Sequence, residues 1–273
     1  MQHQEVEPPE ALRDAIKDFW YLSRNFDELH PSLEVAPDGY VEIIFYFGGD
    51  CRVATPTGWQ PLGSPFLVGL LQQPALFQAT GLVEFIGIKC FPWAVLELLG
   101  VPVGRDGVRV MAHPIAGLQA ELAEQVRAGQ IIEALAIVQH YCVQARSPMA
   151  ADQLLGKAGK ALHAAAGSLP VSQVAAAAHA TVRTLERKFK QAAGHTVKDV
   201  AGLMRFEQAC IHLWRQPTAS LADVAQQVGY ADQSHMGREF KRYSGGTTPA
   251  AFARHAARWQ REVNTDFVAF ILA

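Results

Sequence analysis

The chain has 273 residues, 49% of them hydrophobic and 18% charged, and its formal net charge is −2. No apolar run reaches the length of a membrane span, and the acidic, polar N-terminus is unlike a signal peptide. The four cysteines are scattered and suggest no disulfide framework. These observations exclude a membrane protein and a secreted disulfide scaffold, and they predict a cytoplasmic protein.

The N-terminal half is long enough for one domain with its own core. Four runs in it are rich in β-branched and aromatic residues and predict strands at 40–47, 66–71, 75–79 and 83–90. Helical patterns follow at residues 93–99, which Gly100 ends, and at residues 115–127 and 130–145. Strands followed by helices predict an α+β domain.

Four aromatic side chains of this half are candidates for a ligand pocket: Phe45, Phe47, Phe85 and Trp93. The alternative is that they pack in the core, which is the more common place for aromatic residues in such runs. A pocket is expected between the sheet and the helix that contains Trp93. Nothing in the sequence identifies the ligand.

The sequence lacks the motifs of an enzyme site. It has no Cys-x-x-Cys pair, no His-Glu-x-x-His sequence, no nucleophile elbow and no phosphate-binding glycine loop. We therefore expect no catalytic residue, no metal site and no cofactor. Cys90 ends a strand-like run and lies two residues before Pro92; it is either a small buried side chain or a thiol that senses oxidants or alkylating agents.

The C-terminal half repeats one short pattern. The sequence LERKFK at residues 185–190 recurs as MGREFK at residues 236–241. Each copy follows a Val-Ala pair, at residues 174–175 and 224–225, at the spacing that a helix, a tight turn and a second helix require. The repeat predicts two tandem helix-turn-helix units, and hence double-stranded DNA as a partner.

Caps, anchors and turns define the two units. The expected helix caps are Ser172, Thr181, Ser220 and either Asp232 or Ser234. The apolar anchors expected in the core are Leu185, Phe189, Met236 and Phe240. The second unit has Gly229 at its turn, whereas the first has His179, which costs about 1 kcal/mol if it must adopt a positive φ. The second unit is therefore expected to follow the standard plan more closely.

The charges are divided unequally between the two halves. Residues 151–261 hold fifteen Lys or Arg and seven Asp or Glu, whereas residues 1–150 hold nine basic and seventeen acidic residues. A basic half joined to an acidic half is expected when only one of them contacts phosphate.

Several short motifs lie in the basic half. They are Leu185-x-Arg187-x-Phe189-Lys190, Gly194-His195-Thr196, Ala222-Asp223-Val224-Ala225, Val228-Gly229-Tyr230, Arg238-x-Phe240-Lys241-Arg242 and Thr248-Pro249. With these motifs, residues 167–254 resemble the DNA-binding domain of AraC/XylS-type bacterial transcription regulators. The resemblance implies that a long helix, at residues 197–215, joins two helix-turn-helix units that enter successive major-groove segments.

We call the second helix of each unit its recognition helix. Candidates for base contacts are Val182, Arg183, Glu186 and Arg187 on the first, and Gln233, Ser234, His235 and Arg238 on the second. Candidates for phosphate contacts are Lys188, Lys190, Lys241 and Arg242. Arg can read guanine, Gln adenine, and Glu cytosine, whereas phosphate contacts carry no sequence information. The alternative for some of these side chains is an ion pair within the helix.

The tract at residues 37–45, with Val68-Gly69, Phe91-Pro92-Trp93 and Leu99-Gly100, also resembles the sensor domain that precedes this DNA-binding domain in part of the family. The resemblance implies a partly open, cupin-like β-barrel and a helical pair that serves dimerisation. The expected fold is therefore an α+β N-terminal domain followed by an all-α tandem helix-turn-helix domain.

The expected domains are a sensor and dimerisation domain at residues 1–147, the DNA-binding domain at 148–258 and a tail at 259–273. The boundary falls near Ser147-Pro148. The apolar stretch at 267–272 either packs on the body or a partner subunit, or is a frayed end.

The sequence thus predicts a bacterial transcription regulator that binds promoter DNA and that a small-molecule effector or a partner controls. Homodimerisation and contact with RNA polymerase are further expectations. The alternatives are a regulator that needs no ligand and a helical module that binds protein.

Overall fold

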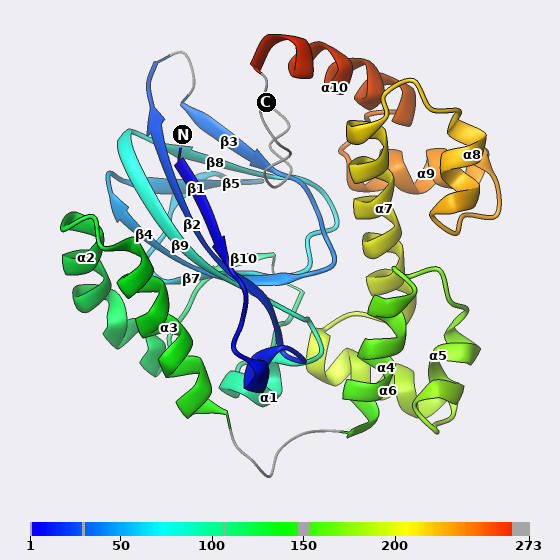
Figure 1. The fold of residues 1–273 in the computed structure, drawn as a ribbon, viewed down its shortest axis with the longest axis horizontal. Helices are drawn as coiled ribbons and strands as arrows, with labels where there is room; N and C mark the ends of the chain where they lie inside the picture. Colours follow the sequence, from blue (N-terminus) through cyan, green and yellow to red (C-terminus); the bar gives the residue numbers. More distant parts are fainter. Residues whose placement is uncertain (1, 29–30, 106, 147–152, 264–273) are drawn as a thin grey trace.

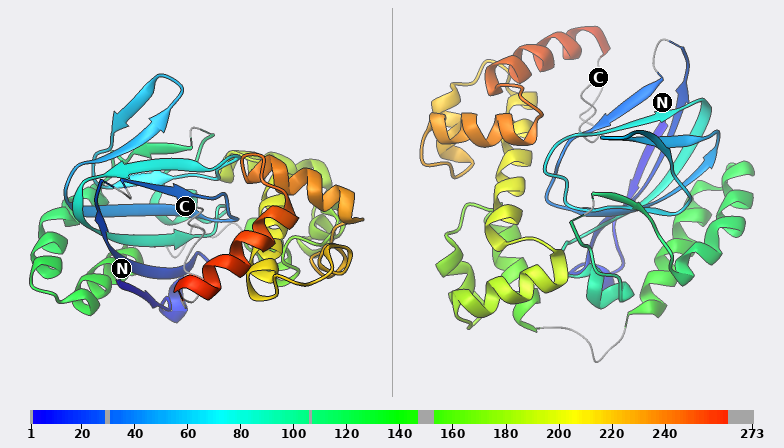
Figure 2. Two further views of the ribbon diagram at one scale, coloured as in Figure 1. Left: turned by 90° about the horizontal axis from the view of Figure 1, so that it is seen from above. Right: turned by 180° about the vertical axis from the view of Figure 1, so that it is seen from behind.

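The computed structural model describes residues 2–28, 31–105, 107–146 and 153–263, with side chains up to residue 258. A β-rich N-terminal half and a helical C-terminal half lie side by side (Figures 1 and 2). This order of a β-rich and a helical part is the one that the sequence predicts. The expected boundary at Ser147-Pro148 and the apolar stretch at 267–272 lie outside the described residues.

Two antiparallel sheets form the N-terminal half. The first has the strand order β1 (Gln2–Val6), β2 (Ile16–Phe26), β9 (Gly81–Cys90), β4 (Val41–Gly48), β7 (Phe66–Val68) and β10 (Val108–Val110). The second has the order β3 (Ser32–Val35), β8 (Ala75–Ala79), β5 (Cys51–Thr55) and β6 (Gly58–Pro61). The helices of this half are η1 (Glu10–Leu12), α1 (Val95–Leu99), η2 (Pro114–Leu118), α2 (Gln119–Arg127) and α3 (Ile131–Ala145).

The alternation of side chains along β4 gives the first sheet two different faces. Ile43, Phe45 and Phe47 are buried in the core that α2 and α3 complete on the outer face of the sheet (Figure 1). Glu42 and Ile44 point the other way, into the space between the two sheets. The sheets thus enclose an interior, as in the partly open barrel that the resemblance implies.

Seven helices are described in the C-terminal half: α4 (Gln153–Ala164), α5 (Val171–Ala177), α6 (Val182–Ala193), α7 (Val197–Arg215), α8 (Leu221–Gln227), α9 (Gln233–Tyr243) and α10 (Pro249–Val263). The first helix-turn-helix unit is α5 with α6, and the second is α8 with α9. Helix α7 matches the predicted range of the joining helix and places one unit near each of its ends (Figure 1). The tandem arrangement predicted from the repeat is therefore confirmed.

The two turns have the backbone that the repeat predicts. Gly229 has a φ of 81°, and His179 has a φ of 53°. Both lie in the left-handed region, so the first unit carries a non-glycine residue where the second has glycine.

Three of the expected caps are confirmed. Thr181, Ser220 and Asp232 each accept a hydrogen bond from the backbone N–H three residues ahead, at 3.1, 3.5 and 2.7 Å. The expectation for Ser172 is wrong. Pro170 precedes the first helical residue of α5, where no side-chain cap forms, and Ser172 lies inside the first turn.

Candidate functional site

The first recognition helix, α6, exposes most of the side chains predicted to contact DNA. The exposed ones are Val182, Arg183, Arg187 and Lys190. Lys188 is half-buried. Glu186 is also half-buried, and its carboxylate accepts a hydrogen bond from the backbone N–H of Val197 at 3.3 Å. Glu186 is thus turned toward the start of α7.

The second recognition helix, α9, presents an equivalent surface. Its exposed candidates are Gln233, Ser234, Arg238, Lys241 and Arg242. His235 is half-buried, and its ring packs edge-on against Tyr230 with the centroids 5.2 Å apart. Its Nε2 atom lies 3.6 Å from the carboxylate of Glu239. His235 therefore has partners within the domain, whereas Arg238 points to solvent.

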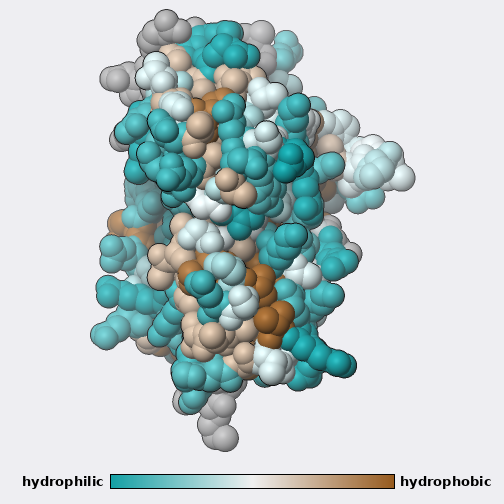
Figure 3. Space-filling view, turned by 90° about the vertical axis from the view of Figure 1, so that its right-hand side faces the viewer, coloured by the Kyte–Doolittle hydropathy of each residue, from teal (hydrophilic) through white to brown (hydrophobic). Residues whose placement is uncertain are grey.

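The two helices hold an arginine in the same place relative to a buried ring. Phe189 and Phe240 are 0% exposed, as are Leu185 and Met236, so the predicted anchors are confirmed. Arg187 and Arg238 stand two residues before these rings and are exposed. Hydrophilic residues predominate on the face of the molecule that the C-terminal half forms (Figure 3).

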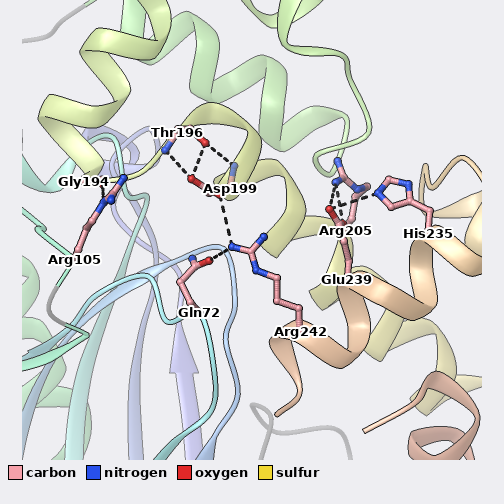
Figure 4. Close-up of polar contacts among 9 residues, drawn as sticks. All are labelled: Gln72, Arg105, Gly194, Thr196, Asp199, Arg205, His235, Glu239 and Arg242. Atoms are coloured by element: carbon pink, nitrogen blue, oxygen red, sulfur yellow. Dashed lines mark hydrogen bonds and ion pairs between the residues drawn. The ribbon is translucent and has the colours of Figure 1, made fainter. Parts of the chain in front are cut away.

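A buried ion pair joins α7 to the second unit (Figure 4). Arg205 of α7 is 9% exposed and lies 3.0 Å from the carboxylate of Glu239 on α9. Its Nη1 atom donates to the carbonyl of Gly167 at 2.8 Å, and its guanidinium lies over the ring of Tyr230. In the sequence, Arg205 is one of the fifteen basic residues of this half, and its one distinguishing signal is its place among the apolar residues of a long helix.

The N-terminal half contacts each recognition helix at its C-terminal end (Figure 4). Arg105 donates from Nε to the carbonyl of Gly194, the residue that ends α6, at 2.9 Å. Arg242 of α9 donates to the side-chain oxygen of Gln72 at 2.7 Å and lies 4.0 Å from a carboxylate oxygen of Asp199. These contacts fix both units relative to the N-terminal half.

Trp93 belongs to the same interface and not to a pocket. Its ring stacks on Phe91 with the centroids 5.0 Å apart and lies 6.1 Å from the ring of Phe189. A Cβ atom at Gly159 of α4 would lie 2.1 Å from this indole, so only glycine fits there. The expected position of the pocket, beside the helix that contains Trp93, is therefore wrong.

The cavity lies between the two sheets. It encloses about 120 Å³, and of the four aromatic candidates only Phe85 lines it. Phe45 and Phe47 face α2 and α3 instead, because the side chains of β4 alternate between the two faces of the sheet. These two rings pack in the core, which is the alternative that the sequence left open.

One end of the cavity is polar. Asp18, Lys89 and Glu42 are directly opposite one another on β2, β9 and β4, so they form a row across the sheet. Lys89 Nζ lies 2.7 Å from Asp38 and 3.5 Å from Glu42, and it lies over the ring of Tyr40. Burial raises the pKa of Glu42 to about 7, against the lowering effect of Lys89.

The cysteines do not form a reactive site. Cys51, Cys90, Cys142 and Cys210 are free and buried. Burial raises the pKa of the Cys90 thiol well above its ordinary value, which favours the uncharged and less nucleophilic form. A small buried side chain is therefore the role of Cys90 that the structure supports.

The described part of the chain contains neither a candidate metal cluster nor a candidate membrane-spanning helix. Residues 2–28, 31–105, 107–146 and 153–263 hold no cluster of His, Cys, Asp and Glu that could bind a metal ion. Within the same ranges, no helix combines the length and the apolar character needed to cross a membrane.

Two family models match the chain. Residues 174–255 match a helix-turn-helix domain, and residues 4–105 match a domain of unknown function. No curated protein matches the chain.

Solved structures of two DNA-binding or ligand-bound proteins are similar to this chain at low identity. ToxT from Vibrio cholerae strain SCE256 with a bound unsaturated fatty acid is 11% identical, covers 85% of this chain and 94% of its own, and has a TM-score of 0.47. The DNA-binding domain of AdpA in complex with a target DNA is 24% identical, covers 42% of this chain and 100% of its own, and has a TM-score of 0.36. These TM-scores are too low to transfer residue roles.

The helix-turn-helix match covers both units seen in the structure, from Val174 of α5 to His255 of α10. All the motifs that carry the resemblance, from Leu185 to Pro249, lie in this range, and so do the four apolar anchors. The chain therefore carries a helix-turn-helix domain of the AraC type, as the resemblance of its sequence motifs implies.

Proposed function

We propose that this protein binds promoter DNA in a sequence-specific manner with both helix-turn-helix units, and that a small molecule in the N-terminal half controls this binding. The observation that carries the proposal is the matched pair Arg187 and Arg238, exposed at the same place on the two recognition helices. An arginine can bind guanine through two hydrogen bonds, and each such contact discriminates between bases by about 1–3 kcal/mol.

The length of α7 supports simultaneous binding by both units. This helix has 19 residues, which at the rise of an α-helix corresponds to about 28 Å. One turn of DNA measures about 34 Å. Recognition helices held near the two ends of α7 can therefore reach successive major-groove segments on one face of the duplex.

The other exposed candidates surround these arginines. Val182 and Arg183 are proposed to flank Arg187, and Gln233 and Ser234 to flank Arg238, at the base edges. Lys188, Lys190, Lys241 and Arg242 are proposed as phosphate contacts, which strengthen binding to every sequence. Glu186 and His235 would have to leave their present partners to reach a base.

Effector control is supported by the position of the cavity beside α7. A Cβ atom at Gly39 would lie 2.8 Å from the side chain of Met204, so the loop at the polar end packs closely on this helix. Glu207, also on α7, interacts electrostatically with Asp38 and Lys89 of the cavity wall. A ligand that changes this contact would shift the population of DNA-binding arrangements, provided that it prefers one of them.

Dimerisation is proposed through α2 and α3. On α3, Ile132 and Val143 are 61% and 40% exposed. A shallow groove between α2 and α3 is lined by both apolar and polar side chains, which are Leu118, Glu121, Ala136, Ile137, His140, Tyr141 and Gln144. Apolar side chains exposed along one helix pair favour contact with a second copy. RNA polymerase stays a predicted partner.

A mobility-shift titration with the DNA upstream of the protein's own gene, at two salt concentrations, tests the DNA-binding proposal. We expect the Arg187→Ala/Arg238→Ala variant to lose at least about thirtyfold in affinity for this DNA, because two base contacts are removed. Arg215→Ala, at the exposed end of α7, is the matched control and should bind like the wild type. A wild-type protein that binds unrelated DNA equally well, or an unchanged double variant, would refute the proposal.

A further inference from the structure

The cavity between the two sheets has an apolar body. Its wall is made by large apolar side chains of both sheets, among them Trp20, Leu22, Phe66, Phe77 and Phe85. Gly87 makes room for Trp20, because a Cβ atom at this glycine would lie 2.0 Å from the indole ring. The volume of this partly open cavity is about 120 Å³, and an apolar cavity of about 150 Å³ holds one benzene molecule. The body of a ligand that fits is therefore about one ring in size.

Negative charge exceeds positive charge at the polar side of this cavity. The lining carboxylates are Glu5, Asp18, Asp38 and Glu42, and the lining basic groups are Lys89 and His3. Even with His3 protonated, the carboxylates outnumber the cations by two. Lys17 and Glu207, which adjoin this end, add one charge of each sign and leave the difference unchanged.

The ammonium group of Lys89 is already engaged. It contacts Asp38 at 2.7 Å and Glu42 at 3.5 Å, and it lies 4.8 Å from the centroid of the Tyr40 ring. A ligand carboxylate would have to displace one of these buried partners, and breaking a buried ion pair is costly. An anionic ligand is therefore disfavoured.

Asp18, in contrast, has an oxygen atom without a partner. The residue is 7% exposed, and its Oδ2 accepts a hydrogen bond from Lys17 Nζ at 2.8 Å. Its Oδ1 is buried and has no hydrogen-bond partner among the described residues. A buried carboxylate oxygen without a donor is unfavourable, so this atom is suited to accept an N–H from a ligand.

We propose that the cavity binds a small organic cation, in which a protonated amine donates to Asp18 Oδ1 and an apolar body of about one ring lies between the two sheets. The bound ammonium also lowers the excess of negative charge in the row. This inference rests on the proposed effector control, and it names the chemical class of the effector.

The raised pKa of Glu42 agrees with this arrangement. Burial is its largest cause, and the charges of Asp38 and Asp18 add to it. A cation bound beside this row would favour the ionised carboxylate, as any nearby positive charge does.

Three probes of nearly the same shape separate the possible ligand charges: 2-phenylethylamine, 3-phenylpropionate and 2-phenylethanol. Each is titrated into the full-length protein by isothermal calorimetry at about pH 7.5, where the amine is protonated and the acid ionised. We expect the amine to bind at least about tenfold more tightly than the alcohol, and the carboxylate to bind more weakly than both. Equal or tighter binding of the carboxylate, or no binding of the amine, would overturn the proposal.

Two substitutions locate the site. Asp18→Asn keeps the shape of the side chain and should weaken amine binding by about tenfold or more, while binding of the alcohol stays unchanged. Asp50→Asn is the control: it removes an exposed charge of the N-terminal half that lies outside the cavity, and it should change neither the binding of the amine nor that of the alcohol. Amine binding that survives Asp18→Asn would contradict the proposed contact; Glu42→Gln, with the same expected direction, replaces that variant if it does not fold.

A parallel titration of DNA binding separates this inference from the proposed function. If the amine binds in the cavity but leaves the affinity for DNA unchanged, the ligand class stands and effector control fails. If the carboxylate or the alcohol binds best and changes the affinity for DNA, effector control stands and the cation assignment fails.

Discussion

The guanidinium of Arg242, on the second recognition helix, donates a hydrogen bond to the side-chain oxygen of Gln72 in the N-terminal half, with a donor to acceptor distance of 2.7 Å (Figure 4). Arg242 is also one of the residues proposed to contact phosphate. The same side chain thus joins the two halves and lies on the proposed DNA-binding surface. If Arg242 contacts phosphate as proposed, DNA binding and docking on the N-terminal half compete for this side chain.

Gln72→Ala should raise the affinity for DNA, because the substitution frees Arg242 from the N-terminal half. An exposed hydrogen bond of this kind contributes about 0.5–1.5 kcal/mol, so the increase should not exceed about tenfold. Fluorescence anisotropy with a labelled DNA fragment measures this affinity. Gln73→Ala, which changes the neighbouring exposed glutamine, is the control. Equal affinities of the two variants would show that Gln72 does not restrain the domain. Arg242→Ala should instead lower the affinity for DNA. It should also reduce the slope of log affinity against log salt concentration by about one, as expected for the loss of one phosphate contact.

His179→Gly should stabilise the protein, because His179 has a φ of 53°. Glycine adopts this conformation without steric cost, and the gain should be at most about 1 kcal/mol. Urea unfolding measures the free energy. Gly229→Ala is the counterpart in the second unit and should destabilise the protein, because a Cβ atom there would lie 2.4 Å from the Cβ atom of Ser168. Destabilisation by His179→Gly would contradict this prediction. It would mean that contacts of the histidine side chain stabilise the folded state by more than its positive φ costs.

Arg205→Ala should destabilise the C-terminal half strongly. The substitution removes the bonds to Gly167 and Glu239 and leaves the half-buried carboxylate of Glu239 without its main partner. Loss of one member of such a pair costs about 3–5 kcal/mol. Urea unfolding again provides the measurement, and Lys198→Ala, at an exposed position of α7, is the control. If the free energy of unfolding falls no more for Arg205→Ala than for Lys198→Ala, this ion pair does not hold α7 and α9 together.

The buried carboxyl groups of Glu42 and Glu207 should lower stability as the pH rises from about 4.5 to 7, against the opposite contribution of His163 and His195, whose pKa values burial lowers. Burial raises the pKa values of both Glu42 and Glu207 to about 7, and Asp38, Asp18 and Lys89 face both groups. In this range the folded protein retains protons that the unfolded chain has lost. The folded state is therefore favoured at the lower pH, and this contribution is lost as the pH passes through the raised pKa values.

The slope of this pH dependence can be assigned by substitution. Each carboxyl group contributes at most about 1.4 kcal/mol per pH unit. Thermal unfolding between pH values of about 5 and 8 should show a flatter slope for Glu42→Gln and for Glu207→Gln than for the wild type. Glu124→Gln, at an exposed position of α2, should retain the wild-type slope. Identical slopes in all four proteins would contradict the assignment.

The helical half was predictable because its signals are local. Buried anchors such as Phe189 and Phe240 recur at helical spacing, and capping residues such as Thr181 and Asp232 stand directly before the helices. The ion pair of Arg205 with Glu239 could not be predicted, because the partners are 34 residues apart and nothing in the sequence pairs them.

The N-terminal half was less predictable because its contacts are not local. Strand β2 pairs with β9 across more than fifty residues, and only β9 is predicted from the sequence. One face of β4 holds Val41, Ile43, Phe45 and Phe47, but this pattern does not tell whether the helices or the second sheet cover that face. For Phe45 and Phe47 the sequence therefore leaves both a pocket and the core open; the structure places them in the core, whereas Glu42 on the opposite face lines the cavity.

Hydroxyl-radical footprinting on a DNA site selected by the wild-type protein tests most directly whether both units bind DNA together. We expect two protected segments on one face of the duplex, with centres about 10–10.5 base pairs apart. Arg187→Ala should weaken protection of one segment and Arg238→Ala that of the other. A single protected segment, or loss of the same segment in both variants, would contradict the account.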